Sequence, residues 1–250
     1  MKDYESIKKI LVEFLKNYIT KKSKSKNLLI GVSGGIDSAV VATLCAAAMP
    51  KNTHALIMPT NASSTKNIDD ALNLCKKLGL NFKILNIQAI LDAFGDSIGE
   101  DIDKLRKGNL SARVRMSLLY DYSASINALV VGTSNKSELM LGYGTIFGDL
   151  ACAINPIGEL YKTEIFEFAK YLGVDENIIN KAPSADLWDG QSDEADIGYT
   201  YETIDEILKG IAGWNLGASV DKFGQDTVDE IVKRVESNKF KRQMPLIAKI

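Results

Sequence analysis

The chain has 250 residues, of which 46% are hydrophobic and 25% are charged, and its formal net charge is −2. This composition is typical of a globular protein with enough apolar side chains to bury a full core. The small net charge excludes attachment to nucleic acid through an overall basic field, so we expect no nucleic-acid partner. The longest apolar run, residues 39–49, is too short to span a bilayer, and the first residues lack the apolar segment of a secretory signal. We therefore expect a cytoplasmic protein that makes no membrane contact.

Cysteine and histidine are too few for several common kinds of site. The three cysteines, Cys45, Cys75 and Cys152, are odd in number and have no Cys-x-x-Cys spacing. Their pattern excludes a disulfide framework and disfavours a zinc ribbon. Any Ser-His-Asp triad or histidine-ligated metal would have to use the single histidine, His54, and nothing in the sequence around it supports either role.

Strand-like and helix-like segments alternate along the chain. Short apolar runs predict four strands, at 27–32, 54–58, 82–87 and 128–132. Helical patterns predict helices at 7–18, 39–49, 64–79 and 110–126, another that begins at Lys162, and more after residue 199. The alternation predicts an α/β fold with a doubly wound parallel sheet flanked by helices. We expect a single domain over 1–250 with a C-terminal helical part.

Ligands of such sheets bind at the carboxyl ends of the strands, which directs attention to the residues after Val32, Met58 and Gly132. The polar stretch at 183–196 is predicted to be a long loop, and loops of this length in compact domains are often functional. We expect it to be mobile without ligands and to close over the site when they bind.

The strongest local signal is the sequence Ser-Gly-Gly-Ile-Asp-Ser at 33–38, directly after a predicted strand and at the start of a helix. Its small residues allow close backbone approach, and the free N–H groups at a helix start favour phosphate. It is neither a Walker loop nor the dinucleotide GxGxxG motif. Asp37 would repel phosphate unless a cation such as Mg²⁺ lay between them, although a glycine-rich turn with an aspartate at the helix start remains the alternative.

These residues resemble the pyrophosphate-binding loop of the N-type ATP pyrophosphatases, which cleave ATP to AMP and pyrophosphate while adenylating a substrate. Further motifs resemble the ammonia-dependent NAD synthetases of that superfamily, in the family's order over about 27–245. They lie at 108–116, 132–138, 142–149, 160–163, 183–187, 191–194 and 241–242.

The resemblance implies ATP-dependent amidation of deamido-NAD by ammonia, giving NAD, AMP and pyrophosphate through an acyl-adenylate. The ATP-binding residues that it implies are Ser33, Gly34, Gly35, Ile36, Asp37, Ser38, Thr133, Lys162 and Ser184. It also implies that Asp37 and Glu138 bind Mg²⁺, that Asp149 binds or deprotonates ammonia, and that Lys162 contacts the ATP phosphates during catalysis.

For deamido-NAD, the resemblance implies contacts from Arg113, Phe240 and Lys241, although Phe240 stands where a histidine is common in relatives. Two further substrate-binding positions depart from the pattern of some relatives, because Ile146 and Ala153 replace a lysine and an aspartate there. The resemblance also implies a symmetric homodimer with the dinucleotide site at the interface, and the helix at 110–126 is one candidate interface element.

Two of these residues also stand out on physical grounds. Lys162 begins a helix, where the helix dipole disfavours a cation, so a bound phosphate would compensate. Arg113 and Arg115 are two positions apart on one predicted helix and therefore point to different faces.

Other functions remain open from the sequence. One alternative is another N-type ATP pyrophosphatase, either GMP-forming or tRNA-thiolating, although no paired reactive cysteines or basic RNA-binding face are visible. A second is a nucleotide-binding module without turnover, which would have no need for the two acidic metal positions Asp37 and Glu138. The nitrogen donor is expected to be free ammonia, with a separate glutaminase chain as the other possibility.

Overall fold

A four-stranded parallel sheet forms the centre of the protein. The computed structural model describes residues 2–184 and 190–249. The strands are β1 (Asn27–Gly31), β2 (Thr53–Ile57), β3 (Asn81–Ile84) and β4 (Ala128–Val131), in the order β3-β2-β1-β4. Leu28 of β1 is in register with Thr53 of β2 on one side and with Leu129 of β4 on the other. The predicted doubly wound parallel sheet is confirmed.

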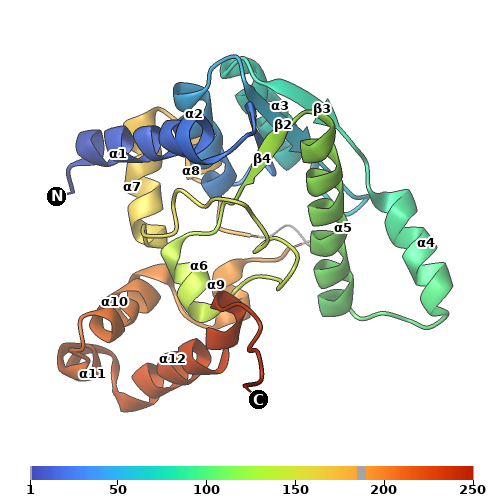
Figure 1. The fold of residues 1–250 in the computed structure, drawn as a ribbon. Helices are drawn as coiled ribbons and strands as arrows, with labels where there is room; N and C mark the ends of the chain where they lie inside the picture. Colours follow the sequence, from blue (N-terminus) through green and yellow to red (C-terminus); the bar gives the residue numbers. More distant parts are fainter. Residues whose placement is uncertain (1, 185–189, 250) are drawn as a thin grey trace.

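Helices cover both faces of the sheet, as Figure 1 shows. Side chains alternate along β1, so Leu28 and Ile30 join one buried cluster and Leu29 joins another. The first cluster packs under α1 (Tyr4–Asn17), α2 (Ile36–Ala48), α3 (Thr65–Lys77), α7 (Lys162–Leu172) and α8 (Glu176–Ile179). The second packs under α5 (Lys104–Ser125), which lies beside α4 (Gln88–Ile98). A five-residue π-helical turn, Tyr18–Lys22, extends α1.

The strand order changes direction at the boundary between β1 and β4. The chain moves outward from β1 to β2 and β3, then returns across the sheet to place β4 on the other side of β1. The chain leaves β1 through the 33–38 loop into α2, on one face of the sheet, and it leaves β4 through residues 132–138. The carboxyl ends of these two neighbouring strands form the switch point at which ligands bind in sheets of this kind. The residues after both strands belong to the motifs that the sequence analysis identified, at 33–38 and 132–138.

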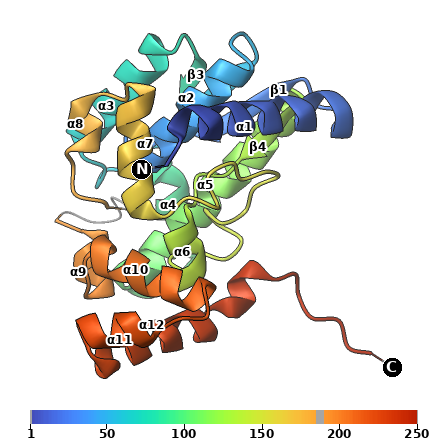
Figure 2. The same cartoon turned by 90° about the vertical axis from the view of Figure 1, so that its left-hand side faces the viewer.

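A C-terminal helical part packs below the carboxyl end of the sheet (Figures 1 and 2). It contains α9 (Asp193–Ile197), α10 (Tyr201–Ala212), α11 (Gly217–Phe223), α12 (Gln225–Ser237) and a 3₁₀ turn at Lys239–Arg242. Its core includes Ile204, Leu208 and Ile231, and it also takes in Leu141 of α6 (Lys136–Leu141). Through α6 and α7 this part is joined directly to the sheet domain.

Some predicted boundaries were wrong. Helix α2 begins at Ile36 rather than residue 39, and α5 begins at Lys104 rather than residue 110 because the Asp103 side chain accepts the Arg106 backbone N–H and caps it. The predicted loop at 183–196 is helical from Asp193, and residues 185–189 lie outside the described residues. The closure predicted for this loop stays a prediction.

Helix α4 was not predicted, although its sequence carries a helical signal. Ile90, Phe94 and Ile98 recur every four residues and form one stripe. None of the 11 residues of α4 is buried, so this stripe is exposed. In residues 2–184 and 190–249, no helix is both long enough and apolar enough to cross a membrane.

Candidate active site

A large cavity opens at the carboxyl ends of the strands, in the crevice between β1 and β4. Its volume is about 1,070 Å³, slightly above the usual range for pockets that hold drug-sized ligands. The segments that line it include the 33–38 loop, the turn after β4, the loop at 142–149, the start of α7 and residues 181–184. The cavity therefore brings together most of the motifs found in the sequence.

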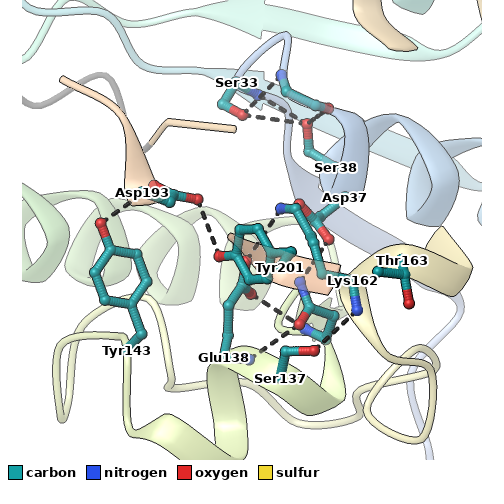
Figure 3. A network of polar contacts seen from close by, with 12 residues as sticks. Ser33, Asp37, Ser38, Ser137, Glu138, Tyr143, Lys162, Thr163, Asp193 and Tyr201 are labelled. Carbon is teal, nitrogen blue, oxygen red and sulfur yellow. Dashed lines mark hydrogen bonds and ion pairs between the residues drawn. The ribbon is translucent and has the colours of Figure 1, made fainter. Parts of the chain in front are cut away.

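The 33–38 loop is held by its own two serines (Figure 3). The Ser33 N–H donates to Ser38 Oγ over 3.3 Å, the Gly35 N–H donates to Ser33 Oγ over 3.2 Å, and Ser38 Oγ donates to the Gly35 carbonyl over 2.9 Å. These bonds fix the turn that leads into α2. The first backbone N–H groups of α2 have no partner within the helix, and this end of the helix lies at the cavity. The geometry is suited to an anion at the helix start.

Gly34 is the position in this loop that only glycine fits. Its φ is +82°, and a Cβ built there would lie 2.2 Å from the backbone oxygen of Asn67 on α3. The loop and α3 are thus in direct backbone contact. A side chain at this position would force the 33–38 loop and α3 apart.

Lys181 fastens the same turn from a third segment. Its ammonium group donates to the Gly34 carbonyl over 2.8 Å, to Asn67 Oδ1 over 2.7 Å and to Asp70 Oδ2 over 2.8 Å. Sequence analysis did not identify Lys181. Its position directly before the predicted ATP-binding segment that contains Ser184 was the available signal.

The chemical centre of the cavity is a buried lysine between two carboxylates (Figure 3). Lys162 is only 2% exposed, and its Nζ lies 2.5 Å from Asp37 Oδ2 and 3.4 Å from Glu138 Oε1. Sequence analysis expected a bound phosphate to offset the unfavourable position of Lys162 at the start of α7. In this structure the two carboxylates already offset it, because they lie within ion-pair distance of the ammonium group.

Asn135 holds the two carboxylates in place relative to each other. Its side-chain oxygen accepts the Glu138 N–H, and its own N–H donates to Glu138 Oε2, which together form a capping box at the start of α6. Its amide nitrogen also donates to Asp37 Oδ1 over 2.9 Å. Asn135 is fully buried, and the sequence analysis assigned it no role.

Burial shifts the pKa values of this cluster. Burial, together with the neighbouring Asp37, raises the pKa of Glu138 to about 8, against the opposing effect of Lys162. Burial also disfavours the charged form of Lys162, but Asp37, Glu138 and Asp193 outweigh it, and the pKa of Lys162 is raised. Lys162 therefore remains a cation, while Glu138 can hold a proton at neutral pH.

A third carboxylate, Asp193 of α9, faces this cluster from the C-terminal helical part. It accepts hydrogen bonds from Tyr143 Oη over 3.2 Å and from Tyr201 Oη over 3.3 Å. Burial raises the pKa of both tyrosines, so their hydroxyls stay protonated and donate. The ring centre of Tyr201 lies 5.4 Å from Lys162 Nζ, which adds a cation–π contact.

Asp149 and Lys241 lie together at another wall of the cavity. Asp149 accepts the Thr145 N–H over 2.7 Å, while Lys241 Nζ donates to the carbonyls of Gly142 and Gly144 and so fastens the loop at 142–149. Asp149 is reached by solvent through the cavity but is surrounded by protein, and the resulting desolvation raises its pKa. Burial lowers the pKa of Lys241, although Asp149 counteracts part of that effect.

The other predicted residues divide between the cavity and the surface. Thr133 and Ser184 line the cavity. Arg113 is exposed and lines a separate cavity of about 210 Å³ next to α4. Phe240 is exposed and is not among the residues that line the large cavity. Arg115 does line it, and its Nε donates to the Met58 carbonyl over 3.0 Å, so the two arginines face different sides of α5 as predicted.

Comparison with known proteins identifies the family. The model of the NAD synthase family matches residues 7–245. This chain belongs to the NAD synthase family. It is 52% identical to an NH₃-dependent NAD⁺ synthetase of Campylobacter jejuni over 248 residues, which cover 99% of this chain and all of the relative.

Solved structures of relatives have the same fold over the full length of both chains. The NH₃-dependent NAD synthetase from Campylobacter jejuni, in complex with the nitrate ion, matches with a TM-score of 0.87 at 45% identity. An NMN synthetase from Francisella tularensis matches with a TM-score of 0.90 at 35% identity. The family resemblance found in the sequence motifs is confirmed.

The cluster in this NAD synthase offers few oxygen ligands for a metal ion. Within the described ranges 2–184 and 190–249 there is no group of three or more histidine, cysteine, aspartate or glutamate residues with metal-binding geometry. A closed protein cage for a metal is thus not present in these ranges. Asp37 and Glu138 instead fit a Mg²⁺ ion that takes its remaining ligands from substrate phosphates and water.

We predict that Gly34→Ala disrupts the 33–38 turn of this NAD synthase. The positive φ alone costs about 1–2 kcal/mol for alanine, and the overlap with the Asn67 oxygen adds to it. Gly79→Ala is the matched control, because Gly79 also has a positive φ but has nothing within 4 Å of a built Cβ. Urea unfolding and calorimetric ATP titration should show a larger stability loss and weaker ATP binding for Gly34→Ala than for the control. Equal effects would contradict the proposed clash.

We also predict a pH dependence of stability that originates at Glu138. A folded-state pKa of about 8, against an ordinary value of 4.5, means that the folded protein binds more protons than the unfolded chain between these pH values. The free energy of unfolding should therefore fall as pH rises through this window. In urea unfolding at pH 5, 6, 7 and 8 without ligands, Glu138→Gln should flatten this fall. An identical slope in both proteins would refute the assignment.

Proposed function

We propose that this protein is an ammonia-dependent NAD synthetase. The reaction is the ATP-dependent amidation of deamido-NAD by ammonia, which yields NAD, AMP and pyrophosphate. The observation that carries the proposal is the buried cluster of Lys162, Asp37 and Glu138 beside the 33–38 loop, in a chain of the NAD synthase family. A nucleotide-binding module without turnover has no use for such a costly buried charge cluster.

In the first step, the nicotinate carboxylate attacks the α-phosphorus of ATP, and pyrophosphate leaves. The N–H groups at the start of α2 and the Ser33 and Ser38 hydroxyls hold the phosphates. Lys162 exchanges part of its ion pairing with Asp37 for the phosphate oxygens and balances the charge that develops on them. Mg²⁺, when bound by Asp37 and Glu138 together with the phosphates, supplies Lewis-acid stabilisation of the leaving pyrophosphate.

In the second step, ammonia attacks the acyl carbon of the adenylate, and AMP leaves. Ammonium must first lose a proton, and Asp149 is the proposed base. Its carboxylate is oriented by the Thr145 N–H, and its raised pKa makes it a better proton acceptor than an ordinary aspartate. Lys241 binds the loop that contains Asp149 and keeps this carboxylate at the wall of the cavity.

The direct test is an end-point assay with Mg-ATP, deamido-NAD and ammonium chloride. NAD and AMP should form in equal amounts, and only when every component is present. Parallel reactions with glutamine in place of ammonium test the nitrogen donor. Reactions with nicotinate mononucleotide in place of deamido-NAD test the substrate that the similar NMN synthetase structure suggests. AMP without an amidated product would point to another acceptor, and no ATP cleavage by the folded protein would refute the enzymatic function.

We predict that Asp37→Asn lowers turnover by about 100-fold or more, a loss of the size seen when one charge-stabilising group is removed. The substitution keeps the shape of the side chain but removes the charge that pairs with Lys162 and that would bind Mg²⁺. Asp69→Asn, on the exposed side of α3, is the matched control and should retain turnover. Steady-state rates over a range of Mg²⁺ concentrations measure the effect. Full activity of Asp37→Asn would remove Asp37 from the mechanism.

We further infer that two copies of the chain pair through the α4 side of the molecule. The apolar stripe of α4 is exposed, and Ile84 on the edge strand β3 and Leu105 at the start of α5 are also exposed. Figure 1 shows α4 projecting beside α5 at the border of the molecule. A helix with no buried residue gains little from tertiary packing, and a second copy would cover its stripe. Arg113 lines the small cavity next to α4, so pairing would bring this predicted substrate contact to the interface.

We predict that Phe94→Glu converts a dimer into a monomer, because the substitution places a charge in the middle of the apolar stripe. Trp214→Glu is the control, since Trp214 is another exposed aromatic but lies between α10 and α11. Light scattering coupled to size-exclusion chromatography should give a halved mass for Phe94→Glu only. A monomeric parent protein, or an unchanged mass for Phe94→Glu, would refute this interface.

A further inference from the structure

A buried carboxylate in the C-terminal helical part reaches the two helices that contribute Lys162 and Glu138. Asp205 of α10 is 1% exposed. One of its oxygens accepts a short hydrogen bond from the Ser137 hydroxyl, and the other accepts the Thr163 N–H over 2.8 Å. The Ser137 oxygen in turn accepts the Lys162 N–H over 2.9 Å. Asp205 does not line the large cavity.

These bonds occupy the first two backbone N–H groups of α7. Groups at this position have no partner within their own helix, and they carry the positive end of the helix dipole. Lys162 is the first residue of α7 and Thr163 is the second. The Asp205 and Ser137 oxygens therefore fix the backbone position from which the Lys162 side chain extends. The negative charge of Asp205 also offsets the dipole that disfavours a lysine there.

The same carboxylate fixes the position of Glu138. Ser137 is fully buried on α6 and directly precedes Glu138, so its bond to Asp205 ties α6 to α10. Figure 3 shows Ser137 and Thr163 next to the side chains of Glu138 and Lys162. One turn before Asp205 on α10, Tyr201 packs against Lys162 and donates to Asp193. The same helix thus contacts the charged cluster twice.

We propose that Asp205 is a positioning residue for the adenylation step, acting through Lys162 and Glu138. This inference rests on the proposed function of Lys162. Asp205 sets the distance between the lysine and the two carboxylates without touching a substrate. Misplacing a charge-stabilising group by about 1 Å lowers rates on the order of 100-fold. The C-terminal helical part thus takes part in nucleotide chemistry although its core lies outside the cavity.

The experiment is a double-mutant cycle between Asp205 and Lys162 in the full-length protein. Asp205→Ala should lower kcat about 10- to 100-fold while changing KM for deamido-NAD less than about twofold. Asp205→Asn should lower kcat less, because an amide keeps the shape and can still accept one of the two hydrogen bonds. In the background of Lys162→Met, Asp205→Ala should cost less than about twofold further, since residues that act through each other are not additive.

A general loss of stability requires its own control. Ile231→Ala removes apolar contacts in the core of the C-terminal helical part without touching the network. At an assay temperature well below the melting temperatures of all variants, Ile231→Ala should keep kcat within about twofold of the parent. If Ile231→Ala lowers kcat as much as Asp205→Ala at a matched melting temperature, the role of Asp205 is structural only and the proposal is wrong.

The outcomes separate this inference from the proposed function. If Lys162→Met retains full turnover, the proposed role of Lys162 is wrong, and the cycle gives no support to Asp205. If Lys162→Met impairs turnover but Asp205→Ala lowers kcat by the same factor in both backgrounds, the chemistry stands and the positioning role is refuted. If Asp205→Ala fails to fold, Ser137→Ala and Asp205→Asn test the same two hydrogen bonds, and parental kcat in both would refute the proposal.

Discussion

The site depends on the ion pair between Lys162 and Asp37, which lie 125 positions apart in the sequence. Removing both charges from water is costly, and their attraction repays this only when further hydrogen bonds satisfy the remaining polar atoms. The Asn135 amide donates a hydrogen bond to Asp37, and Glu138 forms a second ion pair with Lys162. The ion pair therefore constrains α2, α6 and α7 to one arrangement, and it places the 33–38 loop beside the only ammonium group that is buried in the described part of the cavity.

The charge around Lys162 is not balanced. Three carboxylates, from Asp37, Glu138 and Asp193, act on one ammonium group. Burial raises the pKa of Glu138 and of Asp193, and repulsion from Asp37 adds to this effect. A proton on Glu138 relieves part of the repulsion when no other cation is near. A divalent cation that arrived with ATP would relieve it better, and the Glu138 proton would then leave, because metal binding to a protonated ligand releases a proton. The excess of carboxylates over ammonium groups in this cluster supports the proposal that Mg²⁺ binds here together with the nucleotide.

Much of the fold could be predicted from the sequence because its signals are local. The apolar runs of β1 and β4 are short and mostly buried, and the two glycines after β1 indicate a tight turn with close backbone approach. The position of Lys162 was also predictable, since a lysine at the start of a helix needs a nearby negative charge. The carboxylates that pair with Lys162 could not be predicted, because whether a phosphate or a carboxylate lies beside the lysine depends on how far α2 and α6 lie from α7.

The residues that sequence analysis missed have roles that exist only through distant contacts. Lys181 acts on Gly34 from 147 positions away, and Asp205 reaches Ser137 from 68 positions away. An aspartate in the middle of an amphipathic helix, such as Asp205 in α10, has the local sequence pattern of any helix, and only its burial distinguishes it. Helix α4 was missed although its apolar stripe is regular, and in a single chain the side chains of this stripe remain partly exposed.

Each element that contributes a residue to the site is held in place by hydrogen bonds or packing from another element. The 33–38 turn is held by α3 and Lys181, Glu138 is held by Asn135, and the start of α7 at Lys162 is held by Ser137 and Asp205. Each supporting side chain is buried or part-buried and hydrogen-bonds to backbone and side-chain atoms in and around the site. Such support reduces the conformational freedom that a nucleotide would otherwise have to remove on binding. The hydrogen bonds around the buried Lys162 and the part-buried Asp37 and Glu138 hold these three groups in place despite the repulsion between the two carboxylates.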